Sequence, residues 1–332
     1  MPAIGRTTFA GLAAPRCSGA PSNVLLGAMS KLLRAGVIGA GVFGGYHASK
    51  WSSFEGVSLA AVLDVDPARA TLLANRHGAV AHLDAASFLE AVDVVSITSP
   101  AGTHAGWALS ALKAGKSVYV EKPLATDLAE ADAIAREADR RGLTVACGFL
   151  ERAAFRVSGL LQAPEAPIRF EAIRRGTPSP RNLDVSVILD LMIHDLDLSL
   201  KMVPGAPFAV EAWGDCVMND LIDQAEAEVA FDDGFIARFV ASRVARTPER
   251  LLTVVYPSGE VEIDLLAGTL RNGADFALDA HFGQAPDARD RLGASLEAFL
   301  NATRGQGLPL ADGWDGARAL DLALAVEQAL GE

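Results

Sequence analysis

Residues 34–64 read RAGVIGAGVFGGYHASKWSSFEGVSLAAVLD, and this stretch decides the fold. The apolar run over 35–39 is typical of a buried strand, 42–52 has the pattern of a helix, and 57–63 is a second apolar run. A strand, a glycine turn, a helix and a second strand in this order form a βαβ unit, in which the two strands lie parallel. We therefore expect a parallel sheet to begin here.

The glycine turn GAGVFG has the spacing of a dinucleotide-binding motif. Gly39 permits the tight turn, Gly41 lets the backbone approach a pyrophosphate, and Gly44 allows the helix to pack closely on the strand. The free N–H groups at the start of the helix favour the negative charge of that pyrophosphate. Asp64 ends the second strand and is placed to accept hydrogen bonds from adenosine ribose hydroxyls, which favours NAD over NADP. The predicted cofactor contacts in this stretch are Gly39, Gly41, Val42, Phe43, Gly44 and Asp64.

Strand and helix candidates keep alternating as far as Cys147. Further strand candidates lie at 92–97, 117–121 and 143–148, and helix candidates lie at 67–76, 101–114 and 126–141. This alternation predicts an α/β fold with a doubly wound parallel sheet, a Rossmann domain, over residues 31–147. For the glycine motif alone, the alternative is an ordinary turn that binds nothing.

The pattern changes after Gly148. Strand candidates lie at 168–174, 208–218, 222–232, 235–243, 251–256 and 260–266, with helix candidates at 184–203, 288–304 and 315–330. Turn residues at 232–234 and 257–259 predict hairpins, and the polar–apolar alternation over 222–232 suits an antiparallel sheet with one solvated face. We therefore predict an α+β domain over 148–332, built on a large open, mainly antiparallel sheet.

The composition excludes several classes of protein. A length of 332 residues exceeds the usual size of one core, in agreement with two domains. The net charge of −12 argues against nucleic-acid or membrane-surface binding, because no basic surplus exists to neutralise phosphates. Cys17, Cys147 and Cys216 lack the spacing of a zinc site or a disulfide framework, so we expect reduced thiols, no metal and a cytoplasmic location.

Residues 1–30 differ from the rest of the chain in having two arginines and no acidic residue. A second methionine, Met29, lies just before the first strand. We interpret this segment as a disordered extension or an upstream start, with a targeting segment as the alternative.

A second turn on the expected ligand side follows the strand at 92–97. It contains Thr98, Ser99, Pro100 and His104. In open parallel sheets the ligand lies outside the carboxyl ends of the strands, so we expect these residues to face the cofactor. The alternative is a plain strand-to-helix turn with a capping serine.

Glu121 and Lys122 follow the strand at 117–121 and are predicted to contact the cofactor at the same edge. A lysine there can hydrogen-bond a substrate hydroxyl and stabilise the alkoxide charge that develops as hydride leaves. The alternative is a solvated surface lysine, which is the commoner situation.

Asp190 and His194 lie in the apolar segment VSVILDLMIHDLDLSL. In a helix, this i, i+4 spacing puts the carboxylate and the imidazole on one face, with Asp197 one turn further on. A carboxylate beside an imidazole raises its basicity and fixes its tautomer, as a general base requires. The alternative is a buried His–Asp pair without a catalytic role.

Three arginines, Arg174, Arg175 and Arg181, gather in the Pro-rich segment RRGTPSPR before that helix. Arginines can hold a diphosphate through bidentate hydrogen bonds, so this segment is a candidate anion clamp. The alternative is a solvated loop.

Together these motifs resemble the glucose–fructose oxidoreductase / inositol dehydrogenase / MocA family of nicotinamide-dependent sugar dehydrogenases. The resemblance runs from Lys31 onward through GAGVFG, VDVVSITSPAGTH, VEKPLA, DLMIHDLDL and DGARALDLALAVEQAL. It implies that Lys122, Asp190 and His194 are the catalytic residues. It also implies a homodimer or homotetramer formed through the C-terminal sheet.

Two stretches are similar to the UDP-N-acetylglucosamine 3-dehydrogenase branch of this family: RRGTPSPR with the following DVSVILD, and GFLER at 148–152. That similarity implies substrate contacts from Arg152, Arg175 and Arg181. It also implies NAD-dependent oxidation at C3 of a UDP-N-acetylhexosamine. Two alternatives remain: a dehydrogenase of inositol or a free polyol, and a regulator that senses the cofactor without catalysis.

Overall fold

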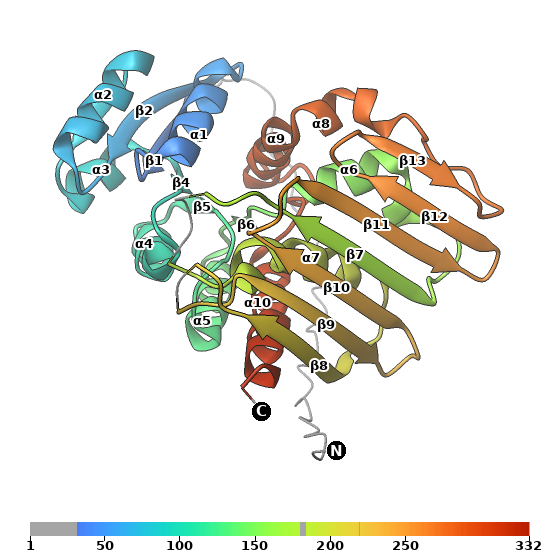
Figure 1. Ribbon diagram of the computed structural model, residues 1–332. Helices are drawn as coiled ribbons and strands as arrows, with labels where there is room; N and C mark the ends of the chain where they lie inside the picture. The colour runs from blue at the N-terminus through green and yellow to red at the C-terminus, as the bar shows by residue number, and fades with distance from the viewer. Residues whose placement is uncertain (1–31, 180–183, 219, 332) are drawn as a thin grey trace.

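Figure 1 shows the computed structural model of the chain, which describes residues 32–179, 184–218 and 220–331. The expected N-terminal extension, residues 1–30, and the predicted substrate ligand Arg181 lie outside these residues. Two sheets stand side by side, the smaller one built from the first half of the chain and the larger one from the second half (Figure 1).

The first sheet has six parallel strands in the order β3-β2-β1-β4-β5-β6. These strands are β1 (Leu33–Ile38), β2 (Val57–Leu63), β3 (Val80–His82), β4 (Val94–Ile97), β5 (Ser117–Val120) and β6 (Val145–Cys147). Every residue of β4, β5 and β6 is buried, as expected of a parallel sheet covered on both faces. The predicted doubly wound Rossmann sheet is confirmed.

The helices that connect these strands begin and end where local chemistry allows. They are α1 (Val42–Ser53), α2 (Pro67–His77), α3 (Ala85–Ala91), α4 (His104–Lys113) and α5 (Leu128–Arg141). At α2 the Asp66 side chain accepts hydrogen bonds from two backbone N–H groups, and Gly78 ends the helix in the left-handed conformation. The short elements β3 and α3 were not predicted, because three and seven residues carry too little periodicity.

The second sheet has seven strands in the order β13-β12-β11-β7-β10-β9-β8, and only the β7–β10 pair is parallel. The strands are β7 (Arg169–Arg175), β8 (Pro207–Asp215), β9 (Gln224–Phe231), β10 (Ile236–Ser242), β11 (Glu249–Tyr256), β12 (Gly259–Asp264) and β13 (Thr269–Asn272). The hairpins predicted at 232–234 and 257–259 join β9 to β10 and β11 to β12. The mainly antiparallel sheet is therefore confirmed.

The two faces of this sheet differ in their surroundings. Along β9, the apolar residues Ala225, Ala227, Val229 and Phe231 are buried, while the residues between them are partly or fully exposed. The buried face packs against the helices α7 (Ile193–Met202) and α10 (Gly313–Ala329), and Glu151 of helix α6 (Glu151–Ser158) pairs with Arg174 on this face. The other face carries no helix within the described part of the chain (Figure 1), and we call it the open face.

The long helix predicted over 184–203 is interrupted. Residues Ile188–Met192 form a π-helical turn, and α7 begins only at Ile193. Asp190 lies in the π turn and His194 in α7, so their side chains do not keep the spacing of one continuous α-helix. Single π turns are frequent at functional sites because they redirect side chains.

Two C-terminal helices complete the cores. After the short helix α8 (Pro286–Arg289), helix α9 (Arg291–Thr303) packs Leu296 and Phe299 against Trp51 and Tyr119 of the first sheet's core. Helix α10 contacts both α5 and α7. The predicted helices at 288–304 and 315–330 correspond to α9 and α10.

No helix among residues 32–179, 184–218 and 220–331 is both long and apolar enough to cross a membrane.

Candidate active site

The glycine turn between β1 and α1 has the shape of a pyrophosphate cradle. Gly39 has a φ of +95°, and a Cβ on Gly44 would overlap the carbonyl oxygen of Gly39. A Cβ on Gly41 would meet nothing within 4 Å, so this side of the turn is open to a ligand. Gly41 caps α1 without any side-chain hydrogen bond, which leaves the first N–H groups of the helix for an anion. These features fit NAD.

Asp64, at the end of β2, faces this turn. Its Oδ2 accepts a hydrogen bond from the Ala40 N–H at 2.6 Å, and its Oδ1 accepts one from the Asp66 N–H at 2.8 Å. Each carboxylate oxygen has a further lone pair, so the ribose hydroxyls predicted to bind here still find acceptors. Arg69 lies 3.4 Å from Oδ1.

The turn after β4 is tied to its surroundings by polar side chains. The Thr98 hydroxyl donates to the Gly39 carbonyl oxygen at 2.8 Å, which joins the two predicted cofactor turns directly. His104 is 2% exposed, and its ring nitrogens lie 2.7 Å from the Pro123 oxygen and 2.8 Å from the Ser99 oxygen. Burial lowers the pKa of His104. The prediction that His104 touches the cofactor is therefore corrected: it links the 98–100 turn to the segment after β5.

Glu121 is buried and is held by a histidine that sequence reasoning missed. His47 Nε2 donates to Glu121 Oε1 at 2.9 Å, while His47 Nδ1 lies 3.0 Å from the Ser96 hydroxyl. His47 is fully buried on the inner stripe of α1, with Gly44, Ala48 and Trp51. A polar residue on that apolar helical stripe was the available signal. Glu121 therefore anchors the start of the 121–123 segment.

Lys122 and Asp190 are brought together, although 68 positions separate them in the chain. The Lys122 ammonium donates to Asp190 Oδ1 at 2.9 Å and to the Asp190 carbonyl oxygen at 2.6 Å. Their side chains are 12% and 11% exposed. The lysine is thus neither a solvated surface residue nor fully enclosed.

His194 is partly buried, with the Phe149 ring edge-on at a centroid distance of 6.1 Å. Its Nδ1 is buried and finds no hydrogen-bond partner among the described residues. Burial, and then the positive charges of Lys122 and Arg174, hold the pKa of His194 well below its usual range. A neutral imidazole can accept a proton.

The predicted Asp190–His194 pair is not formed through Nδ1, and Asp190 binds Lys122 instead. The reason is the π turn, which moves Asp190 off the helical face that carries His194.

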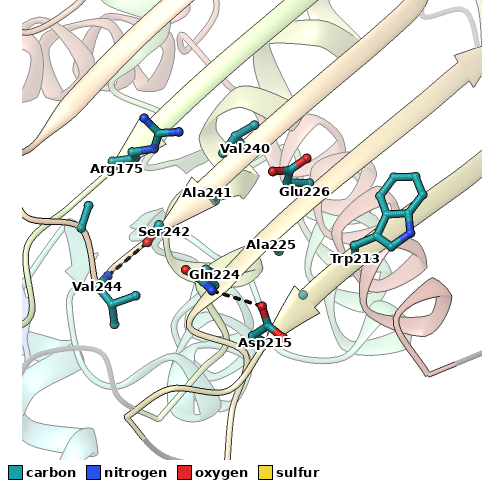
Figure 2. A pocket seen from close by; sticks show the side chains of 12 residues that line it. Arg175, Trp213, Asp215, Gln224, Ala225, Glu226, Val240, Ala241, Ser242 and Val244 are labelled. Atoms are coloured by element: carbon teal, nitrogen blue, oxygen red, sulfur yellow. Dashed lines mark hydrogen bonds between the residues drawn. The ribbon is translucent and has the colours of Figure 1, made fainter.

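The two described arginines of the predicted clamp, Arg174 and Arg175, do not act as one unit. Arg174 and Arg175 are neighbours in β7, so their side chains point to opposite faces of the sheet. Arg174 is 2% exposed and pairs with Asp195 and Glu151 beneath the helices. Arg175 pairs with Glu249 at 2.5 Å on the open face, where it borders a hollow of roughly 400 Å³ (Figure 2).

Arg152, predicted as a substrate ligand, is a buried structural residue. It is 2% exposed and donates to both carboxylate oxygens of Asp197, at 2.8 and 2.6 Å. It also donates to Asp315 at 2.6 Å and to the Leu310 carbonyl oxygen at 2.9 Å. With its guanidinium shared among these acceptors and closed to solvent, Arg152 does not reach a substrate, and we correct that prediction.

Comparisons with protein-family models agree with this architecture. Residues 33–149 match the model described as an oxidoreductase family with an NAD-binding Rossmann fold. Residues 167–264 match the GFO/IDH/MocA C-terminal domain.

Comparisons with individual proteins point the same way. The UDP-N-acetylglucosamine 3-dehydrogenase of Acidithiobacillus ferrooxidans is 36% identical over 306 residues, covering 90% of this chain and 97% of that protein. Its solved structure superposes with a TM-score of 0.83. The scyllo-inositol 2-dehydrogenase (NAD(+)) of Bacillus subtilis is 27% identical, covering 90% of this chain and 94% of that protein.

A more distant structure shares the fold. The WlbA dehydrogenase of Chromobacterium violaceum, solved with NADH and UDP-GlcNAcA, has a TM-score of 0.79 at 18% identity, covering 92% of this chain and 96% of that one.

Proposed function

Because the chain belongs to the Gfo/Idh/MocA family of NAD-dependent oxidoreductases, we propose that it oxidises a secondary hydroxyl of a nucleotide sugar, namely C3 of a UDP-N-acetylhexosamine such as UDP-N-acetylglucosamine. One observation carries the proposal. Lys122 and Asp190 are joined at the carboxyl end of the parallel sheet, and the lysine charge acts on His194, in a chain 36% identical to a UDP-N-acetylglucosamine 3-dehydrogenase.

We assign the chemistry to three residues. His194, neutral and partly open, accepts the proton of the substrate hydroxyl. Lys122 donates a hydrogen bond to the same oxygen and stabilises the negative charge that develops on it. Asp190 accepts a hydrogen bond from the lysine at 2.9 Å and fixes its position. Bound NAD supplies the hydride acceptor.

We propose NAD rather than NADP as the cofactor. The Asp64 carboxylate lies at the end of β2, where it suits two ribose hydroxyls and repels a 2′-phosphate. The contacts assigned to NAD are the glycine turn, Asp64 and the Thr98–Pro100 turn.

A second candidate substrate is inositol or a free polyol, which the 27% identity to scyllo-inositol 2-dehydrogenase favours. Incubating the protein with NAD and a panel of UDP-sugars, N-acetylglucosamine and inositols tests both. We expect NADH with UDP-N-acetylglucosamine and none with the inositols. Because an unfavourable oxidation can stall, enzyme-bound NADH after one turnover counts as a positive result. Turnover of inositol alone would refute the nucleotide-sugar assignment.

The pH dependence of kcat/KM provides a further prediction. The pKa of His194 is lowered, so the imidazole stays unprotonated at neutral pH and gains a proton only on acidification. We expect kcat/KM to be level through neutral pH and to fall below the ordinary histidine value of about 6.5. A pH profile with its acid limb centred above that value would contradict the assignment of a buried neutral base.

We also propose that the chain forms a homo-oligomer through the open face. Exposed apolar side chains gather there, among them Ile236 at 38%, Leu251 at 39% and Trp213 at 59%. A patch of this kind on a sheet is typical of an interface.

Light scattering coupled to gel filtration tests the oligomer. We expect the wild type to have at least twice the mass of one chain. In the double variant Ile236→Asp/Leu251→Asp, we expect the dissociation constant of the oligomer to rise at least tenfold, which corresponds to about 1.4 kcal/mol. Leu308→Asp, at an 84% exposed residue in the α9–α10 connection, is the matched control. A monomeric wild type would rule the proposal out.

A further inference from the structure

A cluster of five charged side chains lies beneath the second sheet, next to His194. Its carboxylates are Glu151 and Asp195, and its guanidinium groups are those of Arg174, Arg250 and Arg291. Three positive charges therefore face two negative ones. The Lys122–Asp190 pair nearby is balanced, so the cluster carries a surplus of one positive charge.

In two of the three arginines, every guanidinium nitrogen has a hydrogen-bond partner. Arg174 binds both oxygens of Asp195, at 2.8 and 2.7 Å, and donates to Glu151 at 3.0 Å. Arg291 binds Glu151 and donates to the carbonyl oxygens of Leu265 and Ala288. Each of their guanidinium nitrogens therefore already has a partner.

Arg250 is different. Its described hydrogen bond is a single long one, 3.4 Å from Nη1 to Glu151 Oε1, and its side chain is 40% exposed. It pairs with Arg174 across the β7–β11 ladder, so the two side chains share the face that the helices cover. Burial and the neighbouring Arg174 lower the pKa of Arg250, the expected response to surplus positive charge.

The position of Arg250 relates it to the reacting group. Arg250 and Arg174 are both among the charges that lower the pKa of His194. A 40% exposed guanidinium with unused donors therefore belongs to the charged cluster that acts on the assigned base.

We infer that Arg250 is a substrate-binding residue that holds an anionic group of the substrate, and that the surplus positive charge of this cluster selects nucleotide sugars over neutral polyols. This inference rests on the proposed function. Two sources of the anion share the same chemistry: the diphosphate of the nucleotide, and a carboxylate at C6 of a sugar acid such as the UDP-GlcNAcA bound by the WlbA relative. A guanidinium binds either through paired N–H donors.

Isothermal titration of the NADH-bound protein tests the inference with three probes: UDP, UDP-N-acetylglucosamine and its C6 uronic acid. For Arg250→Ala we expect affinity to fall about 10- to 150-fold, the range for a hydrogen bond to a charged group. A loss for all three probes identifies the diphosphate as the anion. A loss for the uronic acid alone identifies the carboxylate as the anion and overturns the statement that this cluster selects nucleotide sugars in general. Arg250→Lys keeps the positive charge but lacks the paired N–H donors of a guanidinium. Its affinity for the probes should therefore fall less than that of Arg250→Ala.

The matched control is Arg140→Ala, which removes a 64% exposed guanidinium from α5, away from the cluster and from the open face. We expect it to bind all three probes as the wild type does, and circular dichroism should show native folding for each variant. If Arg250→Ala binds all probes within twofold of the wild type, the inference is overturned. Failure of this inference differs from failure of the proposed function in the turnover of the wild type. A wild type that oxidises no nucleotide sugar refutes the proposed function itself.

Discussion

Replacing His194 with alanine is expected to lower kcat by about 10²–10⁴-fold while the protein stays folded and binds NADH. Burial and positive charge keep the His194 imidazole neutral, and its Nδ1 has no partner among the described residues. Removing it leaves the substrate hydroxyl without a proton acceptor. Steady-state kinetics, with NADH affinity measured by fluorescence titration, checks both parts of the prediction.

Chemical rescue separates a lost base from a general disturbance of the site. His194 is partly exposed, so free imidazole can enter the space left by the side chain. Added imidazole should restore part of the activity of His194→Ala, and it should leave a Lys122→Met variant inactive. A folded His194→Ala protein that keeps most of its turnover would show that another group is the base.

Replacing Arg152 with alanine is expected to lower the free energy of unfolding by about 3–5 kcal/mol, the cost of breaking a buried ion pair by removing one partner. The change leaves Asp197, 1% exposed, and Asp315, 6% exposed, without their shared guanidinium. Burial raises the pKa of Asp197 to about 6 even beside Arg152. The variant can avoid a buried charge by protonating this carboxyl. Its loss in free energy of unfolding, relative to the wild type, should therefore be smaller at acidic pH and larger at alkaline pH.

Urea unfolding at an acidic and an alkaline pH measures this effect. Arg156→Ala is the control, because Arg156 lies in the same helix α6 but pairs with Asp287 at the surface, where both side chains are 40% exposed. We expect the control to lose less than about 1 kcal/mol. If Arg152→Ala unfolds within that same margin of the wild type, the buried network does not stabilise the fold.

The sequence predicts well those parts of the site that depend on local order. A strand, a glycine motif and a helix place the cofactor turn without reference to distant residues, and Lys122 follows from its position after a parallel strand. The prediction that neighbouring arginines act together fails for two reasons. The predicted strand ends at residue 174, whereas β7 runs to Arg175, and alternation along it places Arg174 and Arg175 on opposite faces.

The second reason is that long-range packing sets the partners of a charged side chain. Nothing in the local sequence distinguishes the partners of Arg152 from those of Arg250. Helix α6 buries Arg152 against Asp197, while the β7–β11 register brings Arg250 beside Arg174. His47 shows the same limit, since its contact with Glu121 depends on how α1 lies on the sheet. The π turn at Asp190 likewise leaves no periodic signal in a mostly apolar segment.

Isotope transfer tests the central claim most directly. UDP-N-acetylglucosamine carrying deuterium at C3 is incubated with the protein and NAD, and the products are analysed by mass spectrometry. We expect the deuterium to leave the sugar, the sugar to become the 3-keto compound, and NADH to carry the label. A sugar oxidised with its C3 deuterium retained, or one left unreacted while inositol is oxidised, would contradict the proposed function.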